Sequence, residues 1–194
     1  MAAANVPKGI LDRMGSQHEN TGSVADGDMA VRDVGLPPYR IRRCTVDDAV
    51  PVARLLDELG YPQSVESVRR RLEPWLEDPQ CRVMAVDDGE AVVGVAALRA
   101  MPYFERDGNW GRLVTLVIGS AHRRIGLGTA LLNAVEAEAR ALRCSAMEVT
   151  SGRWRADAQC FYRRRHYDEI SHDFARFFRD LSVGKEPLAR LAPA

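Results

Sequence analysis

The fold is decided by the stretch Leu113-Val114-Thr115-Leu116-Val117-Ile118, which is followed four residues later by Arg123-Arg124-Ile125-Gly126-Leu127-Gly128. As a strand, the first run would carry apolar side chains on both of its faces, which is typical of a strand in the middle of a sheet. The second run enters a helical pattern, because apolar residues recur every four positions from Leu127 to Ala139. We therefore expect a central strand, a short connection and a helix from about Gly126 to Arg140.

The glycine-bearing connection is a candidate anion site. A helix that starts soon after a strand presents several unpaired backbone N–H groups and the positive end of its dipole at one point. Gly126 and Gly128 lack a Cβ, so a bulky phosphate can approach the backbone closely. Arg123 and Arg124 can add charge-assisted hydrogen bonds to phosphate oxygens. The alternative interpretation is a surface loop that happens to contain two glycines.

Two familiar phosphate motifs do not fit this connection. A dinucleotide-binding fingerprint would need a glycine at the position of Leu131, and a Walker-type loop would need Gly-Lys-Ser/Thr shortly after Gly119. One further alternative is a nucleotide-binding regulatory domain that merely shares a glycine turn.

Apolar periodicity predicts further elements on both sides of this unit. Thr45 is expected to cap the first helix with Asp48 at the capping-box position. Pro74 should kink or end the second helix, and Asp88-Gly89 predicts a type I′ hairpin turn. The expected order is a strand at 40–44, helices at 45–59 and 65–76, hairpin strands at 81–87 and 90–99, the central strand and its helix, a strand at 146–150, a helix at 157–164 and a final strand or hairpin arm at 172–181.

This order predicts one mixed α/β domain, a twisted sheet with helices on both faces. The chain has 194 residues, and its 27 basic residues balance 27 acidic ones, so no global charge attracts nucleic acid or a membrane surface. No apolar run is long enough to span a membrane. We expect a cytoplasmic protein that binds no metal, with an extension of uncertain order at 1–38, the domain at 39–182 and a tail at 183–194.

The residues quoted above resemble the GNAT superfamily of N-acetyltransferases. That family has [RQ]-x-x-G-x-[GA] at the start of a helix after an apolar strand, and Arg123, Gly126 and Gly128 match it. A second family pattern, N-x-x-A-x-x-[FL]-Y followed by G-[FY], matches in register further downstream. The matching positions are Ala158, Phe161, Tyr162 and Tyr167, whereas Arg155 replaces the usual Asn and His166 the usual Gly.

The resemblance implies a mostly antiparallel sheet with a splayed parallel pair of strands and acetyl-CoA as cosubstrate. Backbone N–H groups before the glycine turn would bind the pantetheine arm and polarise the thioester carbonyl. Tyr162 aligns with the general acid, since a phenol of pKa about 10 can protonate a departing thiolate. The expected cofactor-binding residues are Leu116, Val117, Ile118, Arg123, Arg124, Ile125, Gly126, Leu127, Gly128, Thr129 and Arg155.

The general base and the acceptor are less well indicated. The central strand holds no acid, so Glu105 is the candidate base, with Asp107 beside it as the alternative, and both would otherwise be solvated loop charges. We expect His122 to contact phosphate or solvent. His166 is expected to replace a glycine at a helix end, and Cys160 is expected to be buried by packing. Acidic side chains near the first helix favour a cationic amine, and the arginine run 69–71 an acidic acceptor or simply a solvated face.

The sequence thus predicts an enzyme that transfers acetyl from acetyl-CoA to a primary amine of a small molecule or peptide, by direct transfer without a covalent enzyme intermediate. A homodimer is one possible assembly. The alternative function is an acetyl-CoA-binding or sensing module that has lost catalysis, which the substitutions at Arg155 and His166 and the missing strand acid would favour.

Overall fold

The computed structural model describes residues 29–30 and 39–170 of the chain. Their strands form one sheet in the order β1-β2-β3-β4-β5-β6, with all neighbours antiparallel except the parallel pair β5 and β6. The expected mixed sheet is therefore confirmed. The strands are β1 (Met29–Ala30), β2 (Arg40–Arg43), β3 (Cys81–Asp87), β4 (Val92–Pro102), β5 (Asn109–Ile118) and β6 (Cys144–Val149).

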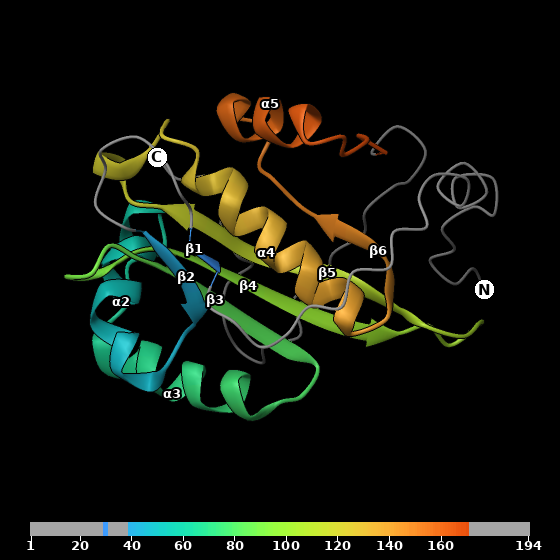
Figure 1. Ribbon diagram of the computed structural model, residues 1–194, viewed down its shortest axis with the longest axis horizontal. Helices are drawn as coiled ribbons and strands as arrows, with labels where there is room; N and C mark the ends of the chain where they lie inside the picture. Colours follow the sequence, from blue (N-terminus) through green and yellow to red (C-terminus); the bar gives the residue numbers. More distant parts are fainter. Residues whose placement is uncertain (1–28, 31–38, 171–194) are drawn as a thin grey trace, which may run out of the picture.

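Helices cover both faces of this sheet (Figure 1). One face packs against α2 (Ala49–Glu58) and α3 (Val65–Glu77), and the other against α4 (Leu127–Ala141). The last described helix, α5 (Ala156–Arg164), lies over the α4 side through Phe161 and Tyr162. Two short 3-10 turns, η1 (Val46–Asp48) and η2 (Ser120–His122), precede α2 and α4.

Side chains along β5 alternate between the two apolar cores except at Val114, where an extra residue in the strand brings Leu113 and Ile118 to the same face. Leu113 and Ile118 join the core under α4 together with Leu131, which is fully buried. Val117 joins the other core, under α2 and α3. This is why the run from Leu113 onward is apolar on both faces, as a central strand should be.

The middle of β5 carries a bulge and a fork. Ala97 of β4 pairs with Thr115, whereas the next residue, Leu98, pairs with Leu113, so Val114 is an extra residue in β5. The last parallel pair with β6 is Leu113 with Val149. Beyond Leu113, β5 keeps its β4 neighbour but has separated from β6. This opening matches the expected splayed parallel pair.

Several local predictions are confirmed and others need correction. The capping box of Thr45 and Asp48 is present, although a 3-10 turn separates it from α2. Pro74 does not end its helix, because α3 continues to Glu77. The hairpin turn is not type I′, since that type needs two successive residues at positive φ and, in this turn, only Gly89 has one, at +94°. The strand expected at 172–181 lies outside the described residues.

Candidate functional site

The second half of β5 has backbone groups on one side that pair with none of the strands described in the structure. Gly119 N donates to Val93 O at 2.8 Å, so the ladder to β4 runs through every second residue before it. By this alternation Thr115 and Val117 direct their N–H groups to β4. Leu116 and Ile118 direct theirs to the side of the opening. The predicted pantetheine contacts therefore keep a geometric basis at Leu116 and Ile118 but lose it at Val117, which is 4% exposed.

The connection from β5 to α4 forms a concave backbone turn. Arg124 has a φ of +66° and Gly126 a φ of +90°, the left-handed region in which non-glycine residues are uncommon. Gly126 is the N-cap of α4, and its carbonyl accepts from Thr129 N and Ala130 N at 3.0 and 3.1 Å. The N–H groups of Leu127 and Gly128, in the first turn, have no acceptor within the helix. They point toward the place where an anion would bind.

The two glycines fit a pyrophosphate for different reasons. A Cβ on Gly126 would meet nothing within 4 Å, so the protein's own packing does not exclude one, but the positive φ does. A Cβ on Gly128 would make ordinary contacts with Phe161 at 3.7 Å and Ile118 at 3.9 Å. Packing within the protein therefore does not require glycine at position 128. A ligand that approaches the backbone closely at this position would require it.

The side chains of the connection differ in what they face. Arg123 turns back toward the protein, where its Nε donates to Ile118 O at 2.9 Å and its Nη2 to Glu58 Oε2 at 3.3 Å. Arg124 is exposed, and Ile125 is 40% exposed. Leu127 is buried in the core under α4 and contributes only backbone. The exposed guanidinium of Arg124 can therefore make the predicted phosphate contact, whereas that of Arg123 is already hydrogen-bonded to Ile118 O and Glu58.

Tyr162 lies on α5, the helix that packs beside this opening. Its ring meets Phe161 edge-on at 5.3 Å between centroids and Tyr167 at 5.6 Å. Burial raises the pKa of the Tyr162 phenol to about 12, while the positive charge of Arg155 acts in the opposite direction. The phenol is therefore protonated at neutral pH, as a proton donor must be. Phe161 reaches Gly128, so α5 connects Tyr162 to the start of α4.

The two departures from the downstream family pattern have clear positions. Arg155 is the N-cap residue of α5 and lies near enough to Tyr162 for its charge to act on the phenol. His166 has a φ of +63° directly after α5, where its N–H donates to Arg163 O at 3.1 Å. This confirms the prediction that His166 replaces a glycine at a helix end, because that conformation is the one glycine adopts most easily.

Comparison with known proteins decides the family. The family model described as the acetyltransferase (GNAT) family matches residues 51–167, from α2 to the end of α5. This chain belongs to that family. The protein is therefore an acetyltransferase, and the match includes the fork in β5, the glycine-bearing connection and Tyr162.

Solved structures agree with this GNAT fold. A GNAT family acetyltransferase of Staphylococcus aureus has a TM-score of 0.61 and 22% identity, over 74% of this chain and 98% of that one. Glucosamine-6-phosphate N-acetyltransferase of Arabidopsis thaliana has a TM-score of 0.62 and 16% identity, over 73% and 99%. Ribosomal-protein-alanine N-acetyltransferase of Brucella melitensis has a TM-score of 0.61 and 16% identity, over 74% and 99%. Likenesses at this identity concern the fold alone.

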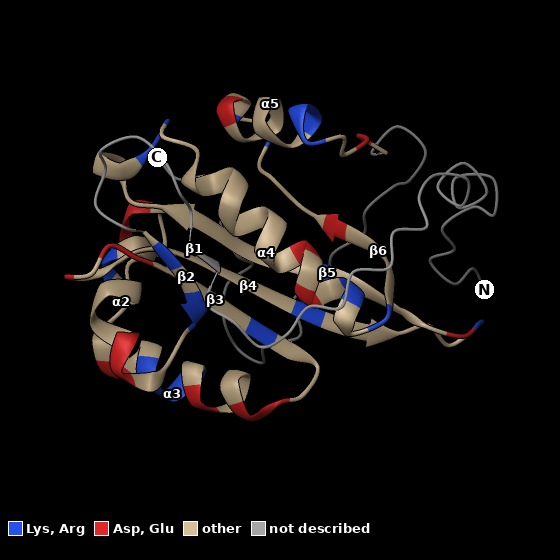
Figure 2. Ribbon diagram, viewed as in Figure 1, with Lys and Arg blue, Asp and Glu red and all other residues tan. Residues whose placement is uncertain are grey.

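Glu105, the expected base, lies far from the opening of the acetyltransferase. It is exposed in the loop between β4 and β5, which projects at the opposite end of the sheet from the start of α4 (Figures 1 and 2). Strand β5 rises about 3.3 Å per residue, so its first residue, Asn109, is about 23 Å from Leu116. The geometry therefore gives no support to a contact between Glu105 and an amine at the fork. Asp107 shares this loop.

A different carboxylate lies at the fork itself. Glu148 of β6 is in register with Arg112 of β5, one residue before the last pair of the parallel ladder. The two side chains form an ion pair, and Arg112 Nη2 also donates to Thr150 Oγ1 at 2.8 Å. The side chain of Glu148 is 43% exposed. Sequence reasoning missed it because the strand pairing that brings Glu148 to β5 has no local signal.

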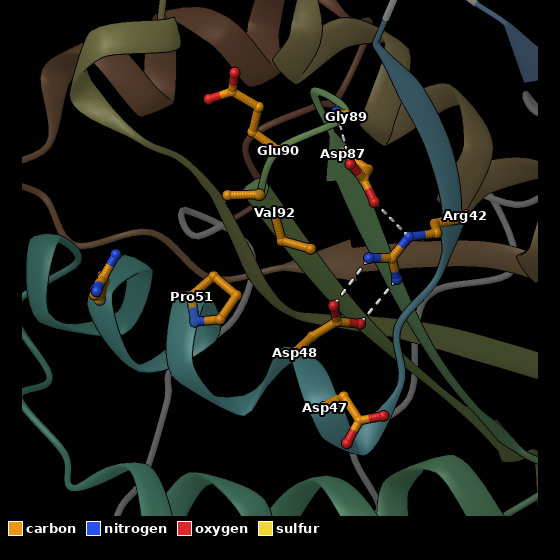
Figure 3. Close-up of a pocket in the computed structure, with 10 residues that line it drawn as sticks. Arg42, Asp47, Asp48, Pro51, Asp87, Gly89, Glu90 and Val92 are labelled. Carbon is orange, nitrogen blue, oxygen red and sulfur yellow. Dashed lines mark hydrogen bonds and ion pairs between the residues drawn. The ribbon is translucent and has the colours of Figure 1, made fainter.

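A second polar centre lies at the N-terminus of α2 and is structural. Figure 3 shows Arg42 between Asp48 and Asp87 in a cavity of about 320 Å³. The guanidinium donates to both oxygens of Asp48 at 2.8 and 2.9 Å and, through Nε, to Asp87 at 2.8 Å. Burial alone would raise the pKa of Asp48, but the Arg42 and Thr45 hydrogen bonds outweigh it and lower the pKa to about 2. The network joins β2, β3 and α2.

The four cysteines are free, and one prediction about them is wrong. Cys44 and Cys81 are buried, and Cys144 is half-buried, but Cys160 is exposed on the outer side of α5 and does not pack in the core. Within residues 39–170 and the short strand β1, no group of three or more His, Cys, Asp or Glu could hold a metal ion. In the same part of the chain, no helix is long and apolar enough to cross a membrane.

Proposed function

We propose that this acetyltransferase moves the acetyl group of acetyl-CoA to a primary amine of a small molecule or peptide by direct transfer. The observation that carries the proposal is the juxtaposition of three features at one end of β5. These are the free backbone groups after the fork, the concave turn at the start of α4, and the protonated Tyr162 on α5. Acetyl-CoA would supply the activated thioester.

The residues of this chain have separate tasks in the proposed reaction. The N–H groups of Leu127 and Gly128, with the dipole of α4, would hold the pyrophosphate. The Leu116 N–H, directed into the opening, would hydrogen-bond the carbonyl oxygen as negative charge develops there. Tyr162 would give its phenolic proton to the departing sulfur. Arg155, beside Tyr162, would then stabilise the phenolate that remains until solvent reprotonates it.

Glu148 is our candidate for the base in place of Glu105. Its carboxylate lies at the fork, whereas Glu105 lies at the far hairpin tip. Steady-state kinetics should separate the two carboxylates. Glu148→Gln should lower kcat about a hundredfold, because an amide cannot take the proton of the attacking amine, while Glu105→Gln should leave kcat unchanged. A wild-type kcat in Glu148→Gln would remove it as the base.

The acceptor class rests on chemistry rather than on fold. Similar folds belong to proteins named for a sugar-phosphate acceptor and for a ribosomal-protein alanine, so the likeness does not choose between small molecules and peptides. A primary amine is proposed because an unprotonated amine can attack a thioester directly. A homodimer stays a prediction.

Thermal stabilisation by acetyl-CoA, followed by thiol release across a panel of polyamines, aminoglycosides, amino acids and peptides, tests the proposal. We expect a rise in melting temperature with acetyl-CoA and CoA and thiol release with at least one amine class. No rise with either ligand would defeat the proposal. A rise without release from any amine would instead favour the alternative of an acetyl-CoA-sensing module.

A further inference from the structure

One side chain reaches the glycine-bearing connection from the opposite core of the protein. Glu58 is the last residue of α2, yet its Oε2 accepts from Ser120 N at 2.7 Å, 62 positions later in the chain. The same oxygen accepts from Arg123 Nη2 at 3.3 Å. Glu58 therefore contacts the connection at two places, just after β5 ends and three residues further on.

Arg123 extends this contact back to β5. Its Nε donates to Ile118 O at 2.9 Å, the carbonyl that the strand alternation directs away from β4. One guanidinium thus joins the end of the strand to the end of α2. The side chains of Glu58 and Arg123 are 38% and 46% exposed, so the pair is partly hydrated and open to competition from an added anion.

These contacts lie immediately before the two residues that give the turn its shape. Arg124 and Gly126 hold positive φ values, and for Arg124, which has a Cβ, that conformation is sterically unfavourable. The hydrogen bonds of Ser120 and Arg123 hold the entering side of the connection in this shape. An anion then meets N–H groups that already point toward it, so less binding energy goes into ordering the loop.

We propose that Glu58 is a positioning residue of the CoA site, which sets the affinity for acetyl-CoA through Arg123 and leaves the chemical step unchanged. The inference rests on the proposed function, because it assumes that the turn binds the pyrophosphate. The inference also changes the role of Arg123, which the sequence predicted to contact the phosphates directly. Arg123 orders the turn, and Arg124 is left to face the phosphates.

The test is calorimetric titration of CoA into the full-length protein, paired with steady-state kinetics on an amine that the panel identifies. Glu58→Ala should weaken the Kd for CoA and raise the KM for acetyl-CoA about tenfold, the size of one hydrogen bond to a charged group. The kcat should stay within twofold. Glu58→Gln, whose amide oxygen can still accept from Ser120 N, should recover part of the loss.

Asp57→Ala is the matched control, because Asp57 is an exposed carboxylate in the same helical turn and its side chain has no described contact with the connection. It should leave the Kd unchanged, which separates a positioning effect from a general loss of negative charge at the end of α2. A double-mutant cycle with Arg123→Ala completes the test. Because Glu58 contacts both Ser120 N and Arg123, the double variant should lose less CoA binding free energy than the sum of the two single losses, and fully additive losses would exclude Arg123 as the route.

Two results would overturn the inference. Wild-type affinity in Glu58→Ala would show that the turn needs no help from α2, and a fall in kcat without a change in Kd would assign Glu58 to the chemistry. If Glu58→Ala does not fold, Glu58→Gln decides on the same two readings. A wild-type protein that binds no CoA would defeat the proposed function itself, a result distinct from a normal Kd in the variants.

Discussion

The two halves of β5 differ in the strands that lie beside them. From Asn109 to Leu113 the strand has β4 on one side and β6 on the other, whereas from Val114 to Ile118 its only neighbour among the described strands is β4. The backbone groups of the first half pair with the neighbouring strands β4 and β6. The second half directs the corresponding groups of Leu116 and Ile118 into an opening. A bulge of one residue and the departure of β6 thus divide one strand into a structural half and the half that we propose binds acetyl-CoA, called the binding half below.

The proposed binding half therefore differs from the rest of the strand in its backbone groups, which lack a neighbouring β6 residue on one side, and not in particular side chains. Buried strand groups that lack a partner are costly, so a sheet does not normally leave them unpaired. Here the opening ends at the turn before α4, where further N–H groups are unpaired. A ligand that accepts hydrogen bonds along its length would satisfy both sets.

The largest effect is expected from breaking the binding half at its end. Gly126→Asp should reduce CoA affinity more than about a thousandfold, because it adds negative charge where the pyrophosphate binds. The matched control is Gly89→Asp in the β3–β4 turn, where φ is also positive and a Cβ also meets nothing within 4 Å. Both variants should lose similar stability, and only Gly126→Asp should lose CoA in calorimetric titration. Equal losses of affinity would contradict the assignment.

The proton donor beside the binding half gives the next effect. Tyr162→Phe should lower kcat about a thousandfold with an unchanged Kd for CoA, because general acid catalysis to sulfur is lost. Tyr167→Phe is the control, since its hydroxyl donates to Glu136 Oε1 at 3.0 Å. That variant should lose about 1 kcal/mol of stability and keep its kcat. Parallel loss of CoA affinity in Tyr162→Phe would show a binding residue instead.

A backbone substitution would sharpen the comparison most directly. Replacing the amide of Leu116 by an ester removes its N–H without changing the side chain, and should lower kcat/KM about a hundredfold with little change in stability. The same replacement at Gly111, inside the parallel ladder, should cost about 1 kcal/mol of unfolding free energy and leave turnover intact. Identical behaviour of the two esters would mean that the halves do not differ.

The smallest effect concerns a region outside the opening. The pKa of Asp48 is about 2 when folded and about 3.9 when unfolded, so its contribution is complete above about pH 5 and is lost as the pH falls toward 2. Unfolding titrations should show about 2 kcal/mol less stability across that window, and Asp48→Asn should flatten this part of the profile. At pH 7 the variant should bind CoA normally. An unaltered pH profile would count against the Arg42 network.

Much of the fold could be predicted because it depends on local periodicity. The apolar run after Leu113 and the four-residue spacing after Leu127 identify β5 and α4 without any distant contact. The capping box of Thr45 is local as well. The hairpin turn was predicted less well, since Asp88 Oδ1 accepts from Glu90 N and Ala91 N and so forms a longer turn than Asp-Gly alone indicates.

The site could be predicted only where it is contiguous. The glycine turn and Tyr162 follow from motifs, but Glu58 meets Ser120 across 62 residues and Glu148 meets Arg112 through strand pairing. No short pattern carries such contacts. Glu105 shows the converse problem. It lies only eight residues before Leu113 in the sequence, but the extended strand between them places it at the other end of the sheet.

The exposed thiol of Cys160 has a practical consequence. Two other cysteines are buried and the third is half-buried, so a maleimide dye should label α5 one residue before Phe161 without any engineered cysteine. Such a probe would report by fluorescence when a ligand enters beside Gly128. The same thiol would also react with a disulfide chromogen, adding about one equivalent of background per chain to any thiol-release assay. A Cys160→Ser protein would remove that background and serve as the unlabelled reference.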